Sequence, residues 1–93
     1  MSLGIEFDWD VANIEHLASH TVTPQEFEAV IRNSPVDLEY DEVNGEERFR
    51  SVGTTDAGRL LVVIWTVRDG RIRAVTAFPA SASLKRLFPG SKR

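Results

Sequence analysis

Six arginines in the second half of the chain stand where two predicted hairpins would bring them together. They are Arg48, Arg50, Arg59, Arg68, Arg71 and Arg73. Guanidinium groups bind phosphate through paired N–H donors. Several of them on one sheet would hold an RNA backbone or stabilise the charge that develops during its cleavage. A solvated face of ion-paired arginines is the competing interpretation, and composition alone does not decide between the two.

Two histidines, His16 and His20, are four residues apart on a predicted helix, so their imidazoles share one face. A metal site needs further ligands, but the chain has no cysteine and its nearby acids lack metal-loop spacing. We therefore predict no metal ion and no cofactor. His20 stands at the helix end, where it would serve either as a general base near neutral pH or as a structural residue of the junction.

The net charge of -3 conceals a strong asymmetry between the two halves of the chain. Residues 1–47 carry 12 acids and one base, which gives -11, whereas residues 48–93 carry 10 bases and two acids, which gives +8. Such a split indicates either that the halves neutralise each other in the fold or that a basic surface meets an anionic partner.

Length and composition predict one domain over residues 1–93, because 42% hydrophobic and 27% charged residues are typical of a globular protein. The absence of cysteine excludes disulfides and thiol catalysis. No apolar run approaches the roughly 20 residues of a membrane-spanning helix, and no secretory leader is recognisable. We expect a cytoplasmic protein with no membrane contact.

The central element is a hairpin of two strands, 60–67 and 72–78, joined by Asp69-Gly70, a dipeptide suited to a type I′ turn. If Arg68 faces Arg71, one face is apolar and forms the core. It carries Leu61, Val63, Trp65, Val67, Ile72, Ala74 and Phe78. The other face becomes basic toward the turn. It carries Val62, Ile64, Thr66, Arg68, Arg71, Arg73 and Val75.

A second hairpin precedes it, with strands 36–43 and 46–52 around Asn44-Gly45. Alternation places Val36, Leu38 and Tyr40 on one face of its first strand. The turn sets the register, which predicts one core pair and two ion pairs. These pairs are Tyr40 with Phe49, Asp41 with Arg48, and Glu39 with Arg50.

Helices flank these strands. Asp10 is placed to cap a helix over 11–19, and Thr23, Pro24 and Glu26 form a capping box for a second that ends at 33–35. Ser81 would cap a third. Residues 5–9 alternate as a short strand. The predicted fold is α+β: an antiparallel meander of about four strands plus the short N-terminal strand, packed with two N-terminal helices and one C-terminal helix.

Short motifs along most of the chain resemble the BrnT-type toxin family, which consists of RelE-like bacterial ribonucleases neutralised by ribbon-helix-helix antitoxins. No single motif is specific to that family, but the order and spacing of the motifs together resemble it. The matching segments are Phe7-Asp8-Trp9-Asp10, Asn13, His20-x-Val22-Thr23, Glu46-Glu47-Arg48-Phe49, Gly53, Gly58-Arg59, Thr66-x-Arg68, Arg71-Ile72-Arg73-x-x-Thr76-Ala77 and Ala80.

The resemblance implies a RelE-like α+β domain, RNA as substrate, metal-independent cleavage and a ribbon-helix-helix antitoxin as partner. It identifies His20, Arg48 and Arg73 as the candidate catalytic residues. The remaining arginines of the constellation are candidate substrate-binding residues: Arg50, Arg59, Arg68 and Arg71.

The chain also departs from the family pattern. Phe78 stands where the family has an arginine, Leu84 and Phe88 where it has a glutamate and a tyrosine, and Thr21 where glycine is common. These replacements leave two alternatives to an active ribonuclease. One is a catalytically degenerate member that serves as a protein-interaction module. The other is a nucleic-acid-binding domain without chemistry.

Overall fold

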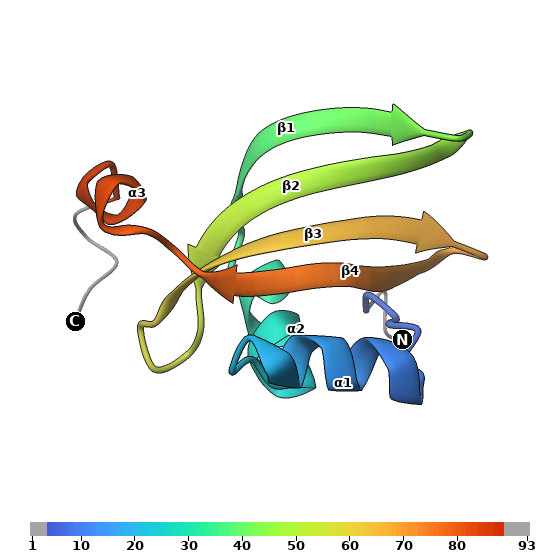
Figure 1. Cartoon of the computed structure of the whole chain (residues 1–93), viewed down its shortest axis with the longest axis horizontal. Helices are drawn as coiled ribbons and strands as arrows, with labels where there is room; N and C mark the ends of the chain where they lie inside the picture. The colour runs from blue at the N-terminus through green and yellow to red at the C-terminus, as the bar shows by residue number, and fades with distance from the viewer. Residues whose placement is uncertain (1–3, 89–93) are drawn as a thin grey trace.

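Four antiparallel strands form one sheet in which each strand pairs with the next along the chain (Figure 1). The computed structural model describes residues 4–88. The strands are β1 (Val36–Val43), β2 (Glu46–Thr54), β3 (Leu60–Arg68) and β4 (Arg71–Pro79). The helices are α1 (Val11–Ser19), α2 (Pro24–Arg32) and α3 (Ala82–Arg86). The predicted α+β meander with two N-terminal helices and one C-terminal helix is confirmed.

Both predicted hairpin turns have type I′ character, as expected for Asp69-Gly70. Asn44 and Gly45 have φ angles of 52° and 82°, and Asp69 and Gly70 have φ angles of 54° and 76°. Both central residues of a type I′ turn need positive φ, which asparagine, aspartate and glycine tolerate best. Local sequence therefore fixes both turns, and the turns bring the arginines of neighbouring strands to one end of the sheet.

Both N-terminal helices begin at the predicted caps. The Thr23 hydroxyl accepts from the Glu26 amide, and the Glu26 carboxylate accepts from the Thr23 amide, which completes the capping box of α2. Asp10 caps α1 in the same reciprocal way, with Asn13 as its partner. The sequence predicted the Asp10 cap but not the contribution of Asn13.

The N-terminal segment lies beside β4 without becoming a strand of the sheet. Phe7 forms an isolated parallel bridge with Ile72. The Asp8 amide donates to the Ile72 carbonyl, and the Ile72 amide donates to the Glu6 carbonyl, both at 2.9 Å. The predicted strand over residues 5–9 is reduced to this bridge.

The main core lies between α1, α2 and one face of the sheet, which we call the helix face. Its fully buried residues include Leu17, Phe27, Leu61, Val63 and Ala77. Phe7 and Trp9 pack edge-on against Phe27. In Figure 1 both helices lie below the sheet, with α1 running along β4. We call the opposite face, which α2 does not cover, the open face.

A smaller apolar cluster covers one end of the open face. Val52, Leu60, Val62 and Ala80 are buried there, with Phe78 and α3 residues packed against them. The hairpin prediction put Phe78 on the core face with Leu61 and Val63, and that assignment is wrong. The register shifts between Ile64 and Trp65, so that Ile64 pairs with Thr76 while Trp65 pairs with Ala74. The extra residue, Val75, moves Phe78 to the open face and puts Ala77 in the core.

The β1–β2 register is confirmed, with Tyr40 opposite Phe49. Three expectations built on it are wrong. Tyr40 is 55% exposed, so it is not a core residue. A register shift at Leu38 places Asp37 and Tyr40, rather than Leu38 and Tyr40, on the same face. The two predicted cross-strand ion pairs do not form, because Arg48 binds a different carboxylate and, among residues 4–88, Arg50 binds none.

Candidate functional site

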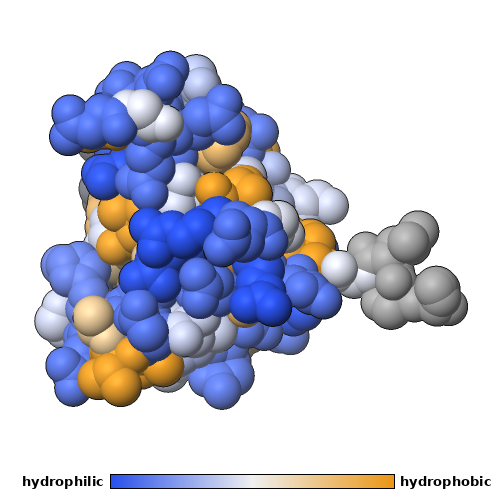
Figure 2. All heavy atoms as spheres, turned by 90° about the vertical axis from the view of Figure 1, so that its right-hand side faces the viewer, coloured by the Kyte–Doolittle hydropathy of each residue, from blue (hydrophilic) through white to orange (hydrophobic). Residues whose placement is uncertain are grey.

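Three of the predicted site arginines line one hollow of about 300 Å³ at the turn end of the open face. Arg48 comes from β2, Arg68 from β3 and Arg73 from β4, while α1 forms the remaining wall. The other lining residues are Ala12, Asn13, His16, Glu46, Thr66, Ala74 and Val75. Figure 2, which looks at the turn end, shows strongly hydrophilic residues gathered in the middle of this side of the molecule with apolar residues on either side.

Arg73 is the most enclosed of the three, with a side chain 19% exposed. Its guanidinium binds Asp10 at 2.6 Å and Asp8 at 3.6 Å. The hydrogen bond to Asp10 and the charges of both carboxylates raise the pKa of Arg73 above its usual value. The pKa of Asp10 is lowered by the Asn13 amide and by Arg73. The two acids that sequence reasoning assigned to a strand face and a helix cap therefore position this arginine.

Glu46 is a site residue that sequence reasoning missed. Its carboxylate accepts from Arg48 at 3.2 Å and lies 3.6 Å from Arg68, so it holds both guanidinium groups at the mouth of the hollow. It is the one carboxylate among the residues that line this hollow. The usable signal was its spacing, because residues two apart on a strand share a face and Glu46 precedes Arg48 by two.

The two histidines form an edge-to-face pair with ring centroids 5.2 Å apart. His16 lines the hollow and shares a 3.0 Å hydrogen bond with the Thr76 hydroxyl. His20, the predicted base, lies one ring further out at the end of α1, with its ring centroid 6.3 Å from that of Phe78. The structure thus joins His20 to the hollow through His16, a residue that sequence reasoning considered only for metal binding.

Arg50 lines a second hollow on the other side of Arg48, of about 200 Å³. Its guanidinium carbon lies 6.0 Å from the centroid of the Phe78 ring. Glu39 and Asp41 of β1 line the same hollow. Arg50 is thus adjacent to the main hollow, but its surroundings are the Phe78 ring and the Glu39 and Asp41 carboxylates.

The two remaining candidate arginines lie away from the main hollow. Arg71 is exposed beside the turn and lies 3.4 Å from Glu6. Arg59 binds Glu26 at 3.0 Å and also donates to the Thr21 carbonyl and hydroxyl oxygens. Thr21 has a φ of 63°, a left-handed conformation that is rare for a β-branched residue. Arg59 therefore holds the α1–α2 junction at Thr21.

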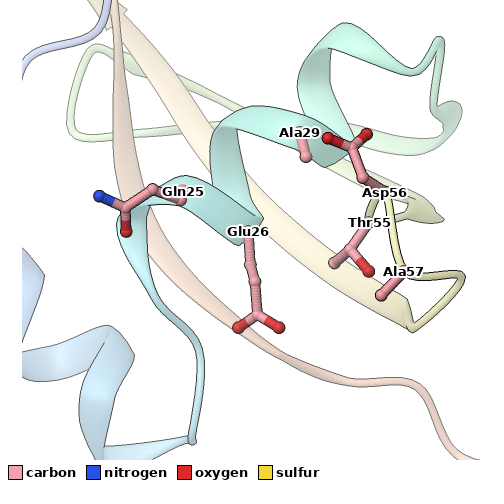
Figure 3. Close-up of a pocket in the computed structure, with 6 residues that line it drawn as sticks. All are labelled: Gln25, Glu26, Ala29, Thr55, Asp56 and Ala57. Atoms are coloured by element: carbon pink, nitrogen blue, oxygen red, sulfur yellow. The ribbon is translucent and has the colours of Figure 1, made fainter.

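Another hollow borders this junction, between α2 and the loop that joins β2 to β3. Figure 3 shows Gln25, Glu26 and Ala29 coming from α2, and Thr55, Asp56 and Ala57 coming from the loop. Burial opposes ionisation of Glu26, but hydrogen bonds from the Thr23 amide and from Arg59 outweigh it, and the net pKa is lowered. Glu26 is therefore committed to these partners, and the other carboxylate of this hollow, Asp56, accepts from the Asn33 side-chain amide.

Within the described range, no three histidine, aspartate or glutamate side chains are arranged to hold a metal ion. No described helix is long and apolar enough to cross a membrane. Residues 9–83 match a family described as the ribonuclease toxin BrnT of type II toxin-antitoxin systems. That range includes every predicted site residue. No curated protein matches the chain.

Proposed function

Because this chain belongs to the BrnT family of ribonuclease toxins of type II toxin-antitoxin systems, we propose that it cleaves RNA on the open face of its sheet without a metal ion. The observation that carries the proposal is the convergence of Arg48, Arg68 and Arg73 on one hollow. Fixed guanidinium groups are suited to the negative charge that develops on a phosphate during cleavage.

In the proposed reaction, a base removes the proton of a ribose 2′-hydroxyl, and the 2′ oxygen attacks the neighbouring phosphorus. The bond from phosphorus to the 5′ oxygen breaks, and that oxygen takes up a proton. The products are a 2′,3′-cyclic phosphate and a free 5′-hydroxyl. Arg48 and Arg73 neutralise the charge on the phosphate oxygens, with Arg68 in support. RNA binding also releases counterions from the phosphate backbone.

His20 remains the proposed base, and the edge-to-face contact of its ring with His16 sets it beside a residue that lines the hollow. Imidazole is suited to proton transfer near neutral pH. Glu46 has a positioning role in this scheme, because its carboxylate orients Arg48 and Arg68. A phosphate that enters the hollow competes with Glu46, Asp8 and Asp10 for the three guanidinium groups.

A type II system supplies a protein antitoxin, and we infer that the antitoxin of this chain is of the ribbon-helix-helix kind. Exposed apolar side chains on β1 support a protein partner at that edge of the sheet. They are Val36, Leu38, Tyr40 and Val43. Edge strands that present apolar residues tend to pair with other chains, and a bound partner would cover them.

The test is cleavage of a defined RNA by the purified chain in the presence of a metal chelator, with the chemical ends of the products identified. Arg73→Ala should reduce the rate by about 10²- to 10³-fold, the usual cost of losing one donor to a developing oxyanion. His20→Ala should reduce it as well. Arg32→Ala is the matched control, because Arg32 lies on α2 and is paired with Glu28 at 3.2 Å, outside the hollow.

Induction of the wild-type chain should arrest growth, and Arg73→Ala should relieve the arrest. The ribonuclease proposal fails if wild type leaves RNA uncut and growth unaffected. Activity that disappears with the chelator and returns with a divalent cation would overturn metal independence alone.

A second candidate function is a degenerate toxin that acts only by binding its partner. The observation in its favour is that each arginine of the main hollow is already ion-paired with a carboxylate. In that case the protein should co-purify with the product of the neighbouring gene while wild type and Arg73→Ala are equally inert toward RNA. A strictly monomeric chain that retains no partner would exclude this candidate.

A further inference from the structure

The open face is organised as successive rows of side chains that cross β2, β3 and β4. One row holds Thr66 and Arg73, which pair across β3 and β4. The next holds Arg50, Ile64 and Thr76, and the one after it holds Val52, Val62 and Phe78. Neighbouring rows on one face are about 6.8 Å apart, or two residues along a strand. The arginine hollow and Phe78 therefore lie about 13 Å apart along the sheet.

The Arg50 guanidinium lies over the Phe78 ring in a cation–π contact. The Arg50 guanidinium carbon lies 6.0 Å from the centroid of the half-buried Phe78 ring, and His20 contacts that ring from the side of α1. A cation within about 6 Å of a ring centroid is attracted by the ring quadrupole. Arg50 also lines the adjacent hollow, so the supported guanidinium borders open space.

Arg50 differs electrostatically from the other arginines of the sheet. Within residues 4–88, Arg48, Arg59, Arg68, Arg71 and Arg73 each bind a carboxylate, and Arg50 does not. Yet Glu39 and Asp41 line its hollow. Two carboxylates repel a phosphate, whereas they accept hydrogen bonds from the exocyclic amino groups of nucleobases. The hollow therefore suits a base better than a phosphate.

We propose that Arg50, supported by Phe78, is a stacking platform for one unpaired nucleobase of the RNA whose phosphate occupies the neighbouring arginine hollow. Single-stranded RNA is recognised by stacking its splayed bases on aromatic rings and guanidinium planes. The inference rests on the proposed ribonuclease function and adds a base-binding subsite to it. Glu39 and Asp41 give that subsite a preference for adenine, cytosine or guanine, which carry an exocyclic amino group, over uracil, which has none.

The geometry also limits the length of RNA that is needed. A stacked strand advances about 3.4 Å per nucleotide, so the separation between the phosphate hollow and the platform is spanned by about four nucleotides or fewer. A hexanucleotide is therefore long enough to reach both. A 2′-O-methyl hexamer cannot be cleaved by attack of its 2′ oxygen, which separates binding from catalysis.

The experiment measures the affinity of the full chain for fluorescent 2′-O-methyl hexamers of adenine, cytosine or uracil, and for hexamers that lack one base. Phe78→Leu keeps an apolar side chain but removes the ring, and Phe78→Tyr keeps the ring. Arg50→Lys keeps the charge but removes the plane. Arg32→Lys is the matched control, because the Arg32 guanidinium carbon lies 5.1 Å from the Phe7 ring centroid on another surface.

Arg50→Lys and Phe78→Leu should each weaken binding of the adenine hexamer by about 10- to 100-fold, the range expected for one stacked base. Phe78→Tyr and Arg32→Lys should bind as wild type does. Removing one base at the platform position should weaken wild-type binding and leave Arg50→Lys binding unchanged. Uracil should bind more weakly than adenine or cytosine.

Three results would overturn the subsite: no wild-type binding to any hexamer, equal affinity for complete and base-lacking hexamers at every position, or wild-type affinity in Arg50→Lys. If Phe78→Leu destabilises the packing of α3, the result for Arg50→Lys alone decides the test. RNA cleavage that is indifferent to Arg50→Lys would remove the subsite and keep the ribonuclease. Base-dependent binding without cleavage of ordinary RNA would keep the subsite and remove the ribonuclease.

Discussion

The two faces of the sheet are built from alternate residues of the same strands, yet one face forms the main core and the other borders the arginine hollow. On the helix face, Leu61, Val63 and Ala77 are completely buried beneath α1 and α2. On the open face, Arg48, Arg68 and Arg73 border a hollow and are held by carboxylates. At the turn end of the sheet, strand alternation thus separates the packed core from the proposed phosphate site, so substitutions on the two faces there should have opposite consequences.

The largest effect is expected on the helix face. Leu61→Ala removes a fully buried side chain and should lower the free energy of unfolding by about 2–5 kcal/mol, because the lost contacts leave a cavity. Urea denaturation followed by circular dichroism measures it. A loss below about 1 kcal/mol would mean that the helix face does not carry the fold.

The reverse pattern is expected for Arg48→Ala on the open face. The rate of RNA cleavage should fall by about 10²- to 10³-fold. The free energy of unfolding should change by less than about 1 kcal/mol, because the ion pair with Glu46 is partly exposed. Cleavage assays and denaturation on the same preparation give both values. Equal activity in wild type and variant, or a stability loss as large as that of Leu61→Ala, would break the separation of the two faces.

Sequence reasoning recovered what short-range chemistry determines. The capping box at Thr23 and the type I′ turns at Asn44-Gly45 and Asp69-Gly70 depend on residues within a few positions of each other. Their prediction succeeded because backbone conformation there is set by local hydrogen bonds and by tolerance of positive φ.

It failed where one extra residue interrupts a strand. The irregularities at Leu38 and Val75 reverse the alternation beyond them, and Phe78 changed face as a result. A β-branched residue in an apolar strand carries no mark of a bulge, because the bulge is decided by packing across the sheet. The face of a residue was therefore predictable only between the turn and the first bulge.

The carboxylates that bind the site arginines were also not predictable from the sequence. Asp8 and Asp10 reach Arg73 across more than 60 residues of sequence, and cross-strand register alone suggested Asp41 rather than Glu46 for Arg48. The arginines themselves were identifiable because the turns group them. The carboxylates that bind Arg73 depend on how the N-terminal segment lies beside β4, which no local pattern specifies.

A smaller effect is expected at the polar contact within the helix face. Ser51 is fully buried, donates to Asp37 at 2.8 Å and accepts from the Trp65 indole at 3.1 Å. Ser51→Ala should cost roughly 1–3 kcal/mol, because it leaves the indole N–H without its partner. Thermal unfolding of Ser51→Ala, Trp65→Phe and the double variant measures the coupling. Strict additivity of the two losses would show that this hydrogen bond does not stabilise the fold.

The smallest effect should appear at Asp10, where the two faces meet. Asp10 caps α1 and binds Arg73, and both interactions hold its pKa below 3.8. Asp10→Asn keeps a capping oxygen and removes the charge. A carboxyl with a lowered folded-state pKa stabilises the fold only while it is ionised. Its contribution is therefore full above the unfolded value and is lost as pH falls through the folded one.

Thermal unfolding of wild type and Asp10→Asn across pH 2 to 7 should thus show a difference near neutrality that closes below about pH 3.8. In an Arg73→Ala background the same difference should shrink, because the cation that Asp10 serves is gone. A gap that persists at pH 2 would show that the effect of Asp10 does not depend on its ionisation, and a gap that is unchanged without Arg73 would assign the effect to the cap alone. In that case the α1 cap would not contribute to holding Arg73 on the open face.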